Sequence, residues 1–197
     1  MEVVVNGNKI DITIESEKTV GDVLKGLEEE FAKNKATTIR ILLNGTKIEA
    51  EAFEDAAKTP LSDSTKIELT VISVAELTES FAFEGKVARE IASSMEEIPV
   101  QLQSGKDKEA SSIISRLADL VDSFCKTASL SSLFPDFYNK ITVDGKNLND
   151  FFSDFSAILA DFKQALEDKD TVLIGDLAEY EISPRLNAIA EAVGGDA

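Results

Sequence analysis

The residues that most often perform catalysis or hold metal ions are scarce in this chain of 197 residues. It contains no histidine, the commonest general base at neutral pH and a frequent zinc ligand. It contains one cysteine, Cys125, and a single thiol can form neither a zinc cluster nor an intramolecular disulfide. Because Cys125 adjoins Phe124 on a helix with an apolar stripe, we interpret it as a buried structural thiol. Glycine-rich phosphate-binding motifs are also missing from the sequence.

Carboxylates are the abundant reactive groups, and their most suggestive arrangement is Asp176, Glu179, Tyr180 and Glu181, followed by Pro184. Asp176 and Tyr180 are four residues apart and share a helix face. Pro184 has no amide hydrogen, so the carbonyl of Tyr180 loses its usual helical partner. An ordinary helix surface with a kink explains this pattern most simply. We therefore predict no catalytic residue, no metal site and no cofactor, and keep a carboxylate-based divalent-metal binder or enzyme as an alternative.

The negative net charge of the chain limits the classes of molecule that it is expected to bind. Residues 1–72 carry 14 acidic and 9 basic side chains, and the remainder carries 23 and 11, so the net charges are −5 and −12 and sum to −17. A field of that sign repels nucleic-acid phosphates and anionic lipids. The N-terminus lacks the basic and apolar segments of a signal peptide, and no apolar run is long enough to span a bilayer. We expect a cytoplasmic protein that binds neither nucleic acid nor membranes.

The sequence pattern of the first third of the chain predicts two strand pairs on either side of one helix, followed by a final strand. Alternating apolar residues predict strands at residues 3–5, 10–14, 39–43, 47–48 and 66–72, with a polar stretch before the last. Asn6-Gly7 and Asn44-Gly45 supply the turn residues of tight hairpins. Apolar residues spaced by three and four predict a helix over 20–31, and Thr19 with Asp22 forms a capping-box pattern at its start.

This order of elements, the helix start Thr19-Val20-Gly21-Asp22 and the hairpin Ile41-Leu42-Leu43-Asn44-Gly45-Thr46-Lys47 resemble the ubiquitin-like β-grasp superfamily over residues 1–73. The resemblance implies a binding module rather than a conjugated modifier, because the last strand continues into the following chain. Gly194-Gly195 is trailed by Asp196-Ala197, and we interpret it as a helix stop. Such domains often dock partners on a partly apolar open sheet face, which makes Leu42 a candidate contact.

The rest of the chain has the pattern of helices in pairs. Apolar residues spaced by three and four predict helices over residues 74–102, 107–128, 148–166 and 171–193. Glu84 interrupts the first stripe, Gly85 is a candidate break, and Pro99 is expected to kink or end the helix. Short turns ending in Lys106-Asp107 and Lys169-Asp170 favour two similar helical hairpins in an antiparallel bundle. The predicted fold class is therefore α+β, with a β-grasp domain followed by this bundle.

Residues 130–147 connect the two hairpins and are long for a connection within a bundle. Phe134, Phe137 and Tyr138 cluster around Pro135. Residues 141–148 have the pattern of a small Asp-Gly hairpin. We expect this insert either to cover one end of the bundle or to bind a partner.

We predict two domains, residues 1–73 and 74–197, and a non-catalytic protein-interaction function such as an adaptor, a chaperone-like protein or an assembly factor, with another protein as its partner. The candidate partner-binding residues are Leu42, Phe134, Phe137, Tyr138, Asp176, Glu179 and Tyr180. Besides the carboxylate alternative, the chain could be a structural subunit of a homo-oligomer. In that case the apolar seam of residues 74–102 would pair between chains.

Overall fold

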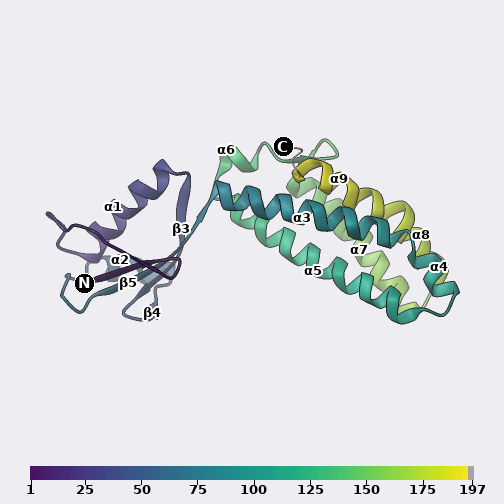
Figure 1. Ribbon diagram of the computed structural model, residues 1–197, viewed down its shortest axis with the longest axis horizontal. Helices are drawn as coiled ribbons and strands as arrows, with labels where there is room; N and C mark the ends of the chain where they lie inside the picture. Colours follow the sequence, from purple (N-terminus) through teal and green to yellow (C-terminus); the bar gives the residue numbers. More distant parts are fainter. Residues whose placement is uncertain (195–197) are drawn as a thin grey trace. The chain divides into compact units, whose positions relative to one another are not determined.

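A computed structural model describes residues 1–194 of the chain. The fold combines a sheet in the N-terminal part with helices after it, so the predicted α+β class is confirmed (Figure 1). The chain divides into two compact units, the first Met1–Glu76 and the second beginning at Leu77.

Five strands form the N-terminal sheet in the order β2-β1-β5-β3-β4. They are β1 (Glu2–Val5), β2 (Asn8–Ile10), β3 (Ala36–Leu43), β4 (Thr46–Lys47) and β5 (Lys66–Ser73). Strands β1 and β5 pair in parallel, while the other neighbours are antiparallel. The first and last strands of the unit are therefore adjacent.

Helix α1 (Val20–Lys33) covers one face of this sheet. Its buried Val20 and Val23 pack with residues of the two parallel strands, which are Val3, Ile67, Leu69 and Val71. The predicted capping box is confirmed, because the Thr19 hydroxyl accepts a hydrogen bond from the Asp22 amide and the Asp22 carboxylate accepts one from the Thr19 amide.

The asparagines of the two predicted turns also bind the central strand. Asn6 and Asn44 both have a positive φ, as tight Asn-Gly turns require. The Asn6 side chain accepts a hydrogen bond from the Val71 amide (2.8 Å) and donates one to the Val71 carbonyl (3.0 Å). The Asn44 side chain accepts one from the Lys66 amide (2.8 Å). Each turn thereby fixes a strand distant in sequence.

The polar stretch that precedes the last strand contains two short helical segments, η1 (Ala50–Ala52) and α2 (Phe53–Ala57). The periodicity of apolar residues could not identify α2, because five residues are too few to repeat a helical spacing.

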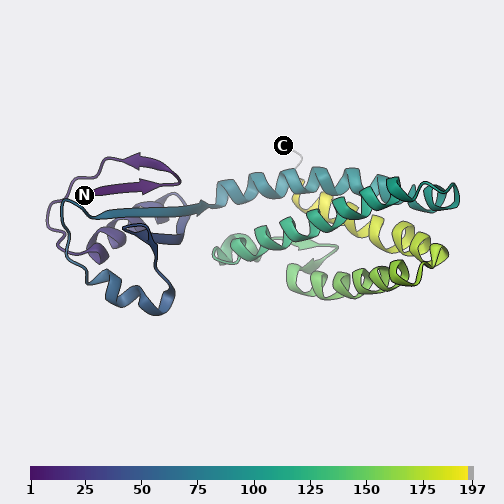
Figure 2. The ribbon, with the colours of Figure 1, turned by 90° about the horizontal axis from the view of Figure 1, so that it is seen from below.

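The second unit contains the long helices of the chain. Its elements are α3 (Val74–Met95, beginning at the end of the first unit), α4 (Ile98–Gln103), α5 (Asp107–Ser131), α6 (Pro135–Tyr138), β6 (Thr142–Val143), β7 (Lys146–Asn147), α7 (Leu148–Asp168), α8 (Thr171–Asp176), the π-helix η2 (Leu177–Ile182) and α9 (Ser183–Val193). Helices α3, α5, α7 and α9 run side by side in both views (Figures 1 and 2).

Two predictions about the first long helix have different outcomes. Helix α3 ends at Met95 and α4 carries Pro99 in its first turn, so the expected interruption near this proline is confirmed. The expected break at Gly85 is wrong, because α3 is continuous there. A Cβ atom on Gly85 would lie 2.9 Å from the Cα atom of Gly194, so the glycine permits a close approach of two backbones. The second glycine of the Gly194-Gly195 sequence lies outside the described residues.

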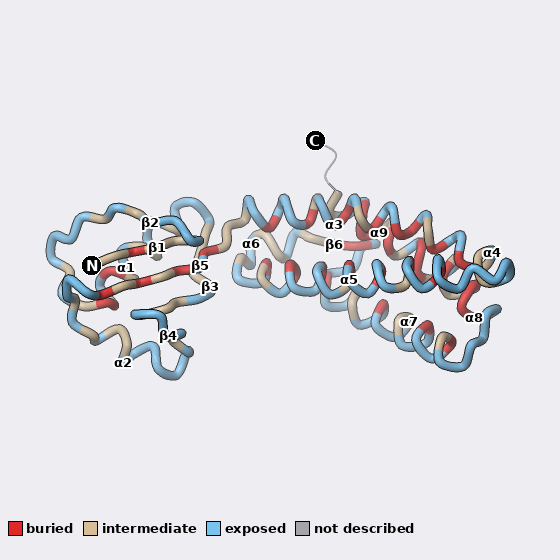
Figure 3. The backbone as a smooth tube through the Cα atoms, turned by 60° about the horizontal axis from the view of Figure 1, so that its bottom comes forward, coloured by how far each residue is buried: buried red, intermediate tan, exposed pale blue. Residues whose placement is uncertain are grey.

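One apolar core fills the helical unit, and the buried residues follow the inward sides of the helices (Figure 3). The seam of α3 belongs to this core, because Phe81, Ala88, Ile91 and Met95 are each at most 2% exposed. The side chains that could have paired between chains are thus packed within their own unit.

The predicted fourth helix consists of α8, η2 and α9. In the π-helix the Ser183 amide donates to the carbonyl of Ala178, five residues earlier. Pro184 then lies in the first turn of α9, where its missing amide hydrogen is not needed. The kink expected at Pro184 is therefore replaced by a wider helical turn.

The long insert folds as predicted into a small hairpin. Strands β6 and β7 pair antiparallel around Asp144 and Gly145, which both have a positive φ. Val143 is completely buried, so the hairpin is held by the core of the helical unit.

Phe124 is the aromatic centre of that core and provides a test of it. It is 1% exposed, and its ring lies 5.3 Å from that of Phe81 and 5.5 Å from that of Phe152. We expect Phe124→Ala to lower the free energy of unfolding by about 3–5 kcal/mol. Urea unfolding followed by far-ultraviolet circular dichroism measures this loss.

The matched control is Phe83→Ala, which removes the same side chain from a position on α3 that is 67% exposed. Its effect should stay within about 0.5 kcal/mol. Equal losses for the two variants would contradict the assignment of the core.

Candidate functional site

The structure places Leu42 in β3 on the sheet face opposite α1. Its neighbours Ile41 and Leu43 pack into the core under α1, and side chains of a strand alternate between faces. Leu42 is paired with Glu68 of β5, which forms an ion pair with Lys66 (3.1 Å). The surroundings of Leu42 therefore include a charged pair, whereas the resemblance implied a partly apolar face.

The aromatic residues of the insert mostly face inward. Phe137 packs on the core, with its ring 6.2 Å from that of Phe81. Tyr138 also packs there, and its hydroxyl donates to the Asn149 side chain (2.9 Å). Phe134 is half-buried. These contacts favour the expectation that the insert covers the core of the helical unit.

The π-helix displays Tyr180 on the surface, where it is 65% exposed. A hydrogen bond to Glu179 and the negative charges of Glu179 and Asp176 raise the pKa of the Tyr180 hydroxyl. The three predicted residues are therefore brought near one another, and the two carboxylates make the phenol harder to ionise.

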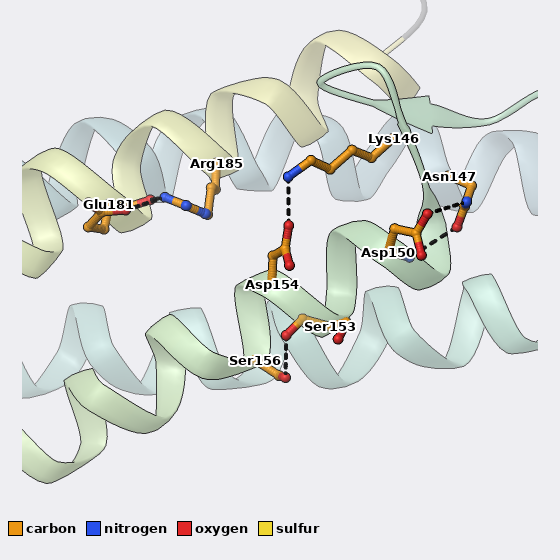
Figure 4. Close-up of polar contacts among 8 residues, drawn as sticks. All are labelled: Lys146, Asn147, Asp150, Ser153, Asp154, Ser156, Glu181 and Arg185. Carbon is orange, nitrogen blue, oxygen red and sulfur yellow. Dashed lines mark hydrogen bonds and ion pairs between the residues drawn. The ribbon is translucent and has the colours of Figure 1, made fainter.

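Two of the carboxylates drawn in Figure 4, Glu181 and Asp154, form ion pairs with basic side chains. Glu181 forms an ion pair with Arg185 (2.6 Å), and Asp154 forms one with Lys146 (2.6 Å). The hydrogen bond from Lys146 and its positive charge lower the pKa of Asp154. Among residues 1–194, no group of three or more acidic or cysteine side chains is arranged to hold a metal ion.

Cys125 is exposed, which corrects its interpretation as a buried thiol. Its neighbour Phe124 faces the core, and one residue along a helix turns the side chain by about 100°. Partial burial, then the negative charges of Asp122 and Glu84, raise the pKa of the thiol. This shift disfavours the reactive thiolate.

The most unusual group of the helical unit is the carboxyl of Glu84 in α3. The residue is only 4% exposed. Its Oε1 atom accepts hydrogen bonds from the Ser123 hydroxyl (2.6 Å) and the Thr127 hydroxyl (2.8 Å) of α5. Its Oε2 atom is buried and has no hydrogen-bond partner. Burial raises the pKa of Glu84, and the two hydroxyl hydrogen bonds oppose this effect only in part.

A cavity of about 340 Å³ lies between α3 and α5 beside this carboxyl. Helix α3 lines it with Phe83, Glu84 and Val87, and α5 lines it with Arg116, Asp119, Leu120 and Ser123. The cavity thus combines the apolar side chains of Phe83, Val87 and Leu120 with polar and charged ones, including the buried acid. Sequence reasoning missed this site, although Glu84 was visible as the interruption of an otherwise apolar stripe.

The comparisons with known proteins cover both units. Residues 1–73 match the TP0873 N-terminal domain, and residues 86–192 match the family described as Domain of unknown function (DUF8042). An "Uncharacterized protein" of Treponema pallidum (strain Nichols) is 26% identical over 193 residues, which cover 98% of this chain and 96% of that protein. No solved structure matches the chain. None of the helices within residues 1–194 combines the length and apolar character needed to cross a membrane.

The raised pKa of Glu84 predicts a specific pH dependence of stability. Its pKa in the unfolded chain is the ordinary 4.5, and the folded value is higher. The stability from the protonated carboxyl is complete below the unfolded pKa and is lost as pH rises through the folded pKa. We expect the free energy of unfolding to fall, relative to Glu84→Gln, as pH rises from 4.5, with a slope of at most about 1.4 kcal/mol per pH unit.

Urea unfolding of both proteins at a series of pH values measures the difference, because all other carboxylates are common to the two. A difference that does not change with pH would show that Glu84 titrates alike in the folded and unfolded chains.

Proposed function

This chain belongs to the family described as Domain of unknown function (DUF8042), and we propose that it is a non-catalytic protein-interaction protein, such as an adaptor, a chaperone-like protein or an assembly factor. Its partner is another protein. Nucleic acid is disfavoured as a partner, because 37 acidic side chains stand against 20 basic ones.

The observation that carries this proposal is the position of Phe83. It is 67% exposed at the cavity between α3 and α5, where Val87 and Leu120 supply further apolar surface. Removing a phenylalanine ring from water is worth about 1.5–3 kcal/mol, and aromatic side chains in pockets are typical anchors of protein interfaces. We therefore assign the cavity between α3 and α5, with the exposed Phe83 beside it, as the main docking surface.

The N-terminal unit is proposed to be a ubiquitin-like β-grasp domain, and the helical unit an antiparallel bundle. The sheet order, with β1 and β5 parallel and adjacent and α1 on one face, supports the first assignment. The side-by-side course of α3, α5, α7 and α9 supports the second (Figure 2). In this proposal Leu42 and the nearby ion pair of Lys66 and Glu68 form a secondary contact surface.

Site-specific photocrosslinking tests the docking surface. A photoreactive phenylalanine analogue in place of Phe83 should form a discrete adduct with one protein in living cells. The same analogue in place of Val172, which is 72% exposed on α8 and does not line the cavity, should form none.

Mass spectrometry of the adducts identifies the partner and the residues joined. Adducts at both positions, or at neither, would contradict a docking surface at this cavity.

A further inference from the structure

The carboxyl of Glu84 is sealed from solvent in a position that suits only its neutral form. Its Oε1 atom accepts hydrogen bonds from the hydroxyls of Ser123 and Thr127, while its buried Oε2 atom has no partner among residues 1–194. An unmatched buried polar group is unfavourable, and an unmatched buried charge is more so. Ionisation in this position is therefore strongly disfavoured, and an ionised carboxylate gains by moving to water.

The path from this position to water is short. Thr127 is buried, but Ser123, which binds the same oxygen, is exposed. Glu84 and Ser123 both line the cavity of about 340 Å³ between α3 and α5, which opens to the surface beside the exposed Phe83. Because Glu84 already forms part of the cavity wall, a change of its side-chain rotamer is enough to carry the carboxylate into the cavity, with both helices in place.

The charged groups around the cavity are of both signs, so a carboxylate there meets no wall of like charge. Arg116 lines it with a positive charge, which it shares with Glu90 (3.1 Å), and Asp119 lines it with a negative one. The end of α9 packs on α3 beside Glu84 through a valine and a glycine, which do not titrate. The remaining titratable groups of α5 near the carboxyl are Asp122 and Cys125.

We propose that Glu84 is a pH-dependent switch of the docking surface: the protonated carboxyl stays in the seam between α3 and α5, and the ionised one turns into the cavity. The inference rests on the proposed function and names its regulation. In the cavity the carboxylate occupies space beside Phe83 and Val87 and holds water there. An apolar side chain of the partner must displace that water and return Glu84 to the seam with a proton taken from solvent. Docking therefore weakens as pH rises.

Thr127→Val distinguishes this switch from a carboxyl that stays buried. The variant keeps the shape of the side chain and removes one donor to Oε1. If the carboxyl stays in the seam when ionised, losing the donor raises the pKa of Glu84, because the hydrogen bond favours the charged form. If the carboxyl leaves the seam, the donor stabilises only the protonated form, and its loss lowers the pKa. We expect the pKa to fall by roughly 0.5–1 pH unit, measured by nuclear magnetic resonance on the isotope-labelled Glu84 carboxyl carbon of the full-length protein.

Three-bond scalar couplings across the Cα–Cβ bond of Glu84 report its rotamer directly and need no variant. We expect one rotamer below the pKa of Glu84 and a different one above it. Glu84→Gln, which cannot ionise, should keep a single rotamer from about pH 4 to about pH 8. The same rotamer on both sides of the native titration, or a pKa that Thr127→Val raises, would overturn the switch.

Photocrosslinking at position 83 tests the effect on docking. The native chain and Glu84→Gln, each carrying the photoreactive analogue, are compared in cell lysate buffered about one pH unit above the pKa of Glu84, where about nine-tenths of the carboxyl is ionised. Glu84→Gln should give the same adduct in at least about twofold higher yield. Equal yields would overturn the regulation and leave the docking surface standing, whereas absence of the adduct from both chains would remove the docking function itself.

Discussion

The helical unit depends on how α3 and α5 share a seam that is apolar except at one carboxyl group. Placing Glu84 at 4% exposure is unfavourable unless its oxygens are hydrogen-bonded. Ser123 and Thr127, four residues apart on α5, supply two hydroxyl donors to the same oxygen. Phe81 and Phe124 make an edge-to-face ring contact in the same seam. Polar matching and aromatic packing thus require one relative register of the two helices, and that register also shapes the cavity beside Glu84.

Much of the fold was predictable because its signals are local. Asn6-Gly7 and Asn44-Gly45 require positive φ angles, and Thr19 with Asp22 satisfies helix-end amides within one turn. The features that the sequence did not predict correctly are set by contacts between residues distant in the chain, or belong to elements too short to show a pattern. Gly85 reads as a helix breaker in sequence, yet it is a contact point for Gly194 more than a hundred residues later. Helix α2 has too few residues to show a period.

The candidate site was less accessible to sequence reasoning. The lack of histidine and the single cysteine directed attention to carboxylates and surfaces. The important carboxyl, however, is defined by Ser123 and Thr127, about forty positions further along the chain, and pairings over that distance leave no pattern in one sequence. The interpretation of Cys125 as a buried thiol was wrong because it relied on its buried neighbour Phe124, and adjacent residues of a helix point in different directions. Exposure of Phe83 likewise follows from packing rather than composition.

The π-helix explains a periodicity that an α-helix could not sustain. The buried residues of the last helical segments are spaced by four, at Ile174, Ala178, Ile182, Leu186 and Ala190. In an α-helix each step of four would rotate the stripe by about 40°, so its two ends would diverge by about 160°. The wider turn of η2 absorbs one surplus residue and keeps both ends on the core. Without the surplus residue, a plain α-helix over this stretch would rotate the stripe by about 60° rather than about 160°. Deletion of one residue here is therefore the change in length that the interior should tolerate best.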